Sequence, residues 1–135
     1  MSAKYQVEEF FAAQLALLLP ELGVPVVPGS SGGHRPKDFV TVNCPDEEAR
    51  GSRGWEVDTR IVSVAQLDDD EGLQASMARL LLLSQFFSSA DCPLRRATQP
   101  GLYIAGIQVL RTTRLQKPAS RGEILPLLVL ATVAG

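Results

Sequence analysis

The chain has 135 residues, a mass of 14.6 kDa and a formal net charge of −2, from 13 basic and 15 acidic side chains. Its 45% apolar and 21% charged content exclude a disordered or collagen-like chain, and one domain of this length buries roughly 70% of its surface on folding. The balanced charge is not typical of a nucleic-acid-binding domain, which is usually strongly basic. We therefore expect one globular domain over residues 1–135, without sequence-specific binding of nucleic acid.

The first predicted element is a helix. Apolar side chains recur at spacings of three and four over residues 4–19, and Pro20 ends the pattern. Glu8 and Glu9 occupy positions where a secretion signal needs an apolar run, so the sequence predicts no such signal. The longest apolar stretch, 124–134, is about half the ~20 residues of a membrane-spanning helix. We expect a protein of the cytoplasm with no membrane partner.

A glycine-rich and a charged segment interrupt the next strands. Residues 24–27 predict a short edge strand or an extended link between prolines, and residues 39–42 predict a second strand. The sequence PGSSGGHRP at 28–36 and the sequence DEEARGSRG at 46–54 both predict mobile surface loops.

Alternation of apolar and polar side chains predicts a long strand at 55–66. A second helix follows, with Asp68 or Asp69 at its N-cap, and it ends near residue 88. Two more strands are predicted at 102–111 and 123–133, joined by a polar, mobile connector at 112–122. The fold class that follows is α+β: a mostly antiparallel sheet with two helices packed on one face, in the order α-β-β-α-β-β.

No residue pattern predicts chemistry. The segment 28–36 lacks the lysine of a phosphate-binding loop, and His34 has no second histidine or thiol pair with which to bind a metal. Neither cysteine, Cys44 or Cys92, belongs to a CxxC motif, and there is no GxSxG nucleophile elbow. The acidic run 68–71 lacks the spacing of an EF-hand loop. We expect no catalytic residue, no cofactor and no metal.

Two features indicate contacts with other proteins. The connector at 112–122 and its borders are basic, and they form either a solvated loop or a contact to an acidic partner surface; the residues are Arg111, Arg114, Lys117 and Arg121. The closing strand is apolar on both faces, whereas a layer of two helices covers only one face of a sheet. The second face predicts an oligomer interface, with candidate residues Leu125, Leu127, Leu128, Val129 and Leu130.

The order of elements, with three sequence stretches, resembles the tail-terminator (tail-completion, minor tail) proteins of tailed bacteriophages and prophages. The stretches are GWEV at 54–57 continuing into TRIVSV, the helix LDDDEGLQASMARLLLL, and the strand GLYIAGIQVL with the closing LLVLATVAG. The loop PGSSGGHRP, the segment 24–27 and the connector LQKPASRG have no counterpart in that pattern.

The resemblance implies a non-enzymatic ring, usually of six copies, that caps the tail tube and joins it to the head connector. It implies assembly in a bacterial host cytoplasm, a final place in the virion tail, and tail-tube and head-connector proteins as partners. A ring closed by heterologous contacts is a natural use for a strand that is apolar on both faces. Two alternatives stay open: a small α+β enzyme or ligand-binding domain, and an oligomeric adaptor of a phage-tail-like injection or secretion apparatus.

Overall fold

A computed structural model describes residues 2–30, 36–117 and 120–134, without the side chains of 115–117. The helical elements are α1 (Ala3–Leu18), the 3₁₀ turn η1 (Pro20–Leu22) and α2 (Asp70–Ser88). The strands are β1 (Val26–Pro28), β2 (Phe39–Arg50), β3 (Gly54–Gln66), β4 (Thr98–Gln99), β5 (Leu102–Val109), β6 (Thr113–Lys117) and β7 (Ser120–Val133).

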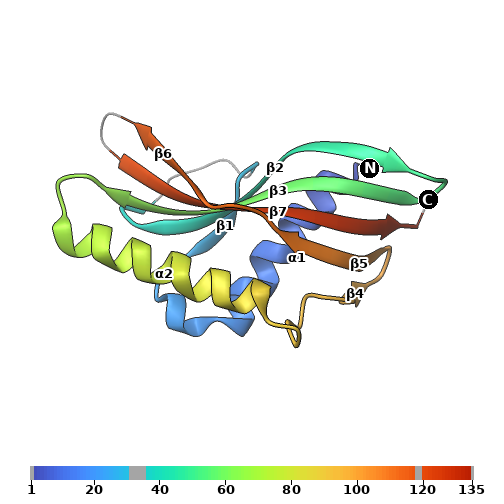
Figure 1. Cartoon of the computed structure of the whole chain (residues 1–135), viewed down its shortest axis with the longest axis horizontal. Coiled ribbons are helices and arrows are strands. Elements are labelled where there is room, and N and C mark those ends of the chain that lie inside the picture. Colours follow the sequence, from blue (N-terminus) through green and yellow to red (C-terminus); the bar gives the residue numbers. More distant parts are fainter. Residues whose placement is uncertain (1, 31–35, 118–119, 135) are drawn as a thin grey trace.

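The strands form one sheet, and the two helices lie on the same side of it (Figure 1). The strand order is β1-β2-β3-β7-β5-β4, with β6 also paired to β7, and only the β1–β2 pair is parallel. We call the helix-covered side the inner face and the opposite side the outer face. The predicted α+β class, with a mostly antiparallel sheet and two helices on one face, is confirmed.

The core lies between the helices and the inner face. The rings of Phe11 in α1 and Phe87 in α2 stack with their centroids 6.0 Å apart, which joins the two helices above the sheet. The central strands contribute fully buried aliphatic side chains, among them Val40, Val42, Val57, Ile61, Ile104, Leu125, Leu127 and Val129. These side chains alternate along each strand with others that face outward.

Both helices have the predicted ends. Pro20 opens the 3₁₀ turn after α1, and Gly23 closes this turn in the left-handed conformation at φ 68°. Asp69 is the N-cap of α2 and accepts a hydrogen bond from the Gly72 N–H at 3.1 Å. Lys37 forms an ion pair with Asp69 at 2.8 Å, which raises the pKa of Lys37 and lowers the pKa of Asp69.

The prediction of a loop at 46–54 is wrong. β2 continues to Arg50, and the chain turns through 51–53 directly into β3. Between Asn43 and Asp46 the register shifts by one residue, and this extra residue of β2 forms a β-bulge that lets the charged half of the strand stay paired. The polar composition of 46–54 suggested a loop. It arises because this half of β2 extends beyond the core, where both faces of the strand are exposed to water.

The prediction of an unstructured connector at 112–122 is also wrong over its described part. Thr113–Lys117 form β6, which pairs with β7 from Ser120 onward, and the two residues between the strands lie outside the described part. In the segment 28–36, Pro28 ends β1, while residues 31–35 and their His34 lie outside the described residues. The mobility predicted for these segments stays a prediction.

Candidate interaction surface

The closing strand β7 has one buried and one partly open face. Leu125, Leu127 and Val129 point into the core and have no exposed surface. Leu128 is half-buried and Leu130 is 42% exposed, and both lie on the outer face. The predicted two-sided apolar pattern is therefore present, and the helix layer covers the set that contains Leu127.

This assignment corrects the candidate interface residues. Leu125, Leu127 and Val129 cannot meet a second molecule, because they are enclosed within their own chain. Only Leu128 and Leu130 of the five face outward. The interface itself stays a prediction, now confined to the outer face.

Side chains of β5 extend this apolar surface. Tyr103 and Leu110 are each 40% exposed, and their positions along β5 and just beyond it place them on the outer face. Gly106 lies opposite Leu130 in the ladder, and a Cβ there would lie 3.7 Å from the leucine Cδ1. A glycine at this position leaves that side of Leu130 uncovered. We call Tyr103, Leu110, Leu128 and Leu130 the outer patch.

Carboxylates flank the outer patch on the β2–β3 hairpin. Between β2 and β3, Asp46 lies opposite Asp58 and Glu48 lies opposite Glu56. On the other side of β3, the same Asp58 and Glu56 lie opposite Leu128 and Leu130 of β7. Like charges in direct cross-strand pairs are unfavourable. Two guanidinium groups offset them: Arg50 contacts Glu48 at 2.8 Å and Glu56 at 2.6 Å, and Arg60 lies 3.5 Å from Asp58. Four carboxylates and two guanidinium groups leave this region with a net charge of −2.

The four residues of the predicted basic contact have different surroundings in the structure. Arg114 and Arg121 both form ion pairs with Glu123, which is nearly buried beside them, the Arg114 pair at 3.4 Å. Because one carboxylate serves two cations, this cluster keeps a net charge of +1. Arg111 is exposed and has no ion pair among the described residues, and the side chain of Lys117 lies outside them. Contact with an acidic partner stays a prediction.

A second apolar surface lies on the helix side. The exposed positions of α2 after its first turn carry no charge, and we call five of them the α2 stripe: Gln74, Met77, Ala78, Leu81 and Gln85. Met77 is 50% and Leu81 is 60% exposed. Depletion of charge with an exposed methionine is typical of the centre of a protein interface. The signal was present in the sequence, where Arg79 is the one charged residue in 72–90.

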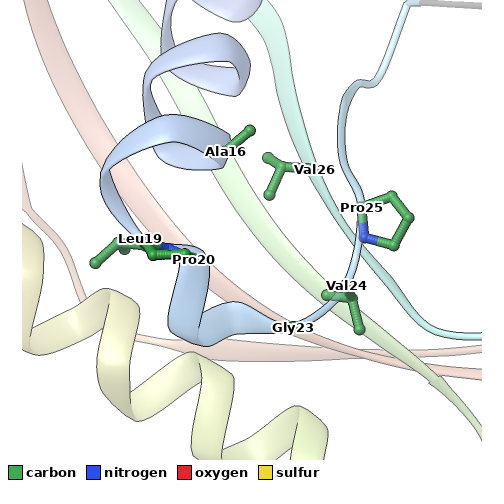
Figure 2. Close-up of a pocket in the computed structure, with 7 residues that line it drawn as sticks. All are labelled: Ala16, Leu19, Pro20, Gly23, Val24, Pro25 and Val26. Atoms are coloured by element: carbon green, nitrogen blue, oxygen red, sulfur yellow. The ribbon is translucent and has the colours of Figure 1, made fainter.

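The structure also contains an apolar pocket of about 390 Å³ where α1 ends and β1 begins (Figure 2). Its lining consists of Ala16, Leu19, Pro20, Gly23, Val24, Pro25 and Val26. None of these side chains can donate a proton or act as a nucleophile. The pocket is therefore suited to an apolar group and offers no chemistry of its own.

A buried carboxylate in α1 has a structural role that the sequence analysis missed. Glu8 is almost fully buried and accepts hydrogen bonds from the backbone N–H groups of Ser30 at 2.7 Å and Cys44 at 3.0 Å. These groups lie where β1 ends and β2 bulges, so the carboxylate takes the place of a missing strand partner. The sequence placed Glu8 near the start of a helix but gave no sign of these distant partners.

A polar contact also attaches α2 to the sheet. The hydroxyl groups of Ser63 in β3 and Ser76 in α2 lie 2.8 Å apart, and each also donates to the other residue's carbonyl oxygen at 3.0 Å. Arg79 Nε donates to the Ser63 hydroxyl at 3.4 Å, and burial lowers the pKa of Arg79. The two serine hydroxyl groups satisfy each other inside a layer that is otherwise apolar, whereas the buried Arg79 Nη2 has no hydrogen-bond partner among the described residues.

Both cysteines are buried, and neither forms a disulfide. Burial raises the pKa of the Cys44 thiol to about 12, while a hydrogen-bond contact with the Thr59 hydroxyl at 3.5 Å acts in the opposite direction. Cys92 is buried and free.

Over residues 2–30, 36–117 and 120–134, no three histidine, cysteine or acidic side chains gather as a metal site. None of the helices in the same ranges has the length and apolar content of a membrane span.

Comparisons with known proteins show a similarity of fold. No protein-family model matches the chain, and no curated protein matches it. Among solved structures, a chain from the "Virion of native gene transfer agent (GTA) particle" superposes with a TM-score of 0.61. The two chains are 17% identical, and the match covers 98% of this chain and 99% of the other. The whole fold is therefore similar to that of a chain from a gene transfer agent virion.

Proposed function

We propose that this protein is a non-enzymatic structural subunit of a phage-like virion, of the tail-terminator type. The observation that carries the proposal is the similarity of fold over the full length to a chain of a gene transfer agent virion. In this role, copies of the chain form a ring that caps the tail tube and joins it to the head connector. The order of sequence elements described above supports the same role.

The surface of the chain supports assembly with other proteins. The outer patch and the α2 stripe both leave large apolar side chains in contact with water. Contiguous exposed apolar groups of this kind mark interaction sites more often than chance exposure does. Burial of one such leucine against a partner gains roughly 1.5–3 kcal/mol before the cost of association.

The test uses the purified protein together with its candidate tail-tube protein. We expect light scattering and negative-stain microscopy to detect rings of the protein alone. When the rings are added to polymerising tube protein, they should bind tube ends and stop elongation.

The matched control is Leu128→Asp, which alters the outer patch and leaves the core residues in place. This variant should neither form rings nor shorten tubes. Unchanged tube lengths in the presence of the wild-type protein would exclude the terminator role, and rings that bind no tube would favour an adaptor in a different apparatus.

A further inference from the structure

We propose that copies of this chain associate head to tail, with the outer patch of one copy lying against the α2 stripe of the next. This inference rests on the proposed function, in which the chain self-assembles, and it names the two surfaces that meet. The occupant of each surface is a second copy of the same chain.

The first argument is that the two apolar surfaces lie on opposite sides of the molecule. The outer patch belongs to the open side of the sheet, and α2 lies on the helix-covered side (Figure 1). A symmetric dimer through either surface leaves the other surface in water in both copies. A heterologous contact covers both surfaces with one type of interface, and such contacts close into rings when the rotation between copies allows.

The second argument is charge complementarity at both ends of the contact. At the sheet end formed by the β2–β3 hairpin, the outer face carries net negative charge, with Glu56 and Asp58 beside the outer patch. On the helix side, the chain passes the same end just after α2, where Arg96 is exposed and has no ion pair among the described residues. A copy stacked in parallel orientation brings Arg96 over these carboxylates.

At the opposite end of the sheet, the outer face is positively charged and the helix side is negatively charged. There Arg111 and Arg114 are exposed beside β5 and β6, while the first turn of α2 carries exposed Asp70 and Glu71. In the same parallel stacking, the acidic start of α2 lies over the two arginines. Between the ends, the uncharged α2 stripe meets the apolar outer patch, so no like charges are brought together.

The test mixes two variants, each with one blocked surface. Leu81→Arg blocks the α2 stripe and Leu130→Arg blocks the outer patch; both leucines are exposed, so both variants should fold, as circular dichroism will verify. Each variant alone should stay monomeric, with a dissociation constant raised at least ~30-fold, the effect of losing a hot-spot contact. Mixed together, they should form a 1:1 heterodimer, because the intact outer patch of Leu81→Arg fits the intact α2 stripe of Leu130→Arg. The heterodimer should not grow, because its two remaining surfaces are blocked.

Controls separate this inference from the proposed function. Leu17→Arg makes the same substitution at an exposed leucine of α1, outside both surfaces, and should assemble like the wild type. Met77→Arg and Tyr103→Arg replace the two test variants if either fails to fold. Normal assembly of Leu81→Arg alone, or a mixture without heterodimers, overturns the head-to-tail contact while wild-type rings still support the proposed function. A wild-type protein that is monomeric at every concentration overturns both.

Discussion

Leu127 and Leu128 are adjacent in β7 and have the same side chain, yet they lie in opposite environments. Leu127 is fully enclosed between the sheet and the helix layer. Leu128 is half-buried on the outer face, opposite Asp58 in β3 and Gln108 in β5. The comparison shows that the two apolar sets of the closing strand differ: one set of side chains holds the monomer together, and the other lies on the surface, where we propose that it meets a partner.

The largest expected effect comes from placing the same charge on each side. Leu127→Asp should unfold the chain, because a carboxylate replaces a leucine in the core and about 4 kcal/mol or more is lost. Leu128→Asp should fold, at a cost of about 0.2–1 kcal/mol from the like charge of Asp58 across the strand pair. Thermal unfolding followed by circular dichroism measures both, and similar melting temperatures for the two variants would refute the assignment of the faces.

A second prediction concerns Glu8, the buried carboxylate of α1. Glu8→Ala removes the acceptor of one buried and one partly buried backbone N–H group, so the free energy of unfolding should fall by about 2–4 kcal/mol. Glu8→Gln retains one carbonyl acceptor and should lose less. Denaturant titration of the three proteins gives the ranking, and an alanine variant as stable as the wild type would show that Ser30 and Cys44 do not need this carboxylate.

A third prediction uses the Cys44 thiol, which lies on the inner side and has its pKa raised to about 12. Above the ordinary thiol pKa of about 8.5, the unfolded chain loses this proton while the folded chain keeps it. Stability should therefore decrease as the pH rises from about 9 toward 12, by at most about 1.4 kcal/mol per pH unit from this group. Cys44→Ala should flatten that part of the stability profile, whereas an equally steep decline in the variant would assign it to other groups.

The smallest effect is expected on the outer side. Arg50→Ala leaves Glu48 and Glu56 facing each other without their shared cation. Because these groups are solvated, the loss of stability should be smaller than that of Glu8→Ala, and it should diminish in ~1 M salt, where screening is strong. Melting temperatures at low and high salt test this, and a salt-independent loss would mean that Arg50 acts through packing.

Much of the fold was predictable because local patterns and tertiary packing agree. The helix ends at Pro20 and Asp69, and the alternation in β3, follow from rules that involve only neighbouring residues. The hairpin at 46–54 was not predictable in this way. Its strands are held by cross-strand partners such as Arg50 and Glu56, and composition alone resembles that of a loop.

The candidate surface was predictable only in part. The pattern of β7 indicated that one apolar set would remain outside the core, but alternation alone does not say which set faces the helices. That assignment depends on the register of β7 against β3, where Leu127 lies opposite the buried Thr59 and Leu128 lies opposite Asp58. The partners of Glu8, in the β1–β2 region, likewise appear only when distant segments are brought together.

The measurement that tests the central claim most directly is the mass in solution of the wild-type protein and of Leu128→Asp, over a range of concentrations, by light scattering. If the outer face of β7 mediates self-association, the wild type will reach a multiple of the 14.6 kDa monomer mass, and the folded variant will remain near 14.6 kDa. A wild-type protein that stays at the monomer mass throughout, or a variant that assembles equally well, would contradict the account.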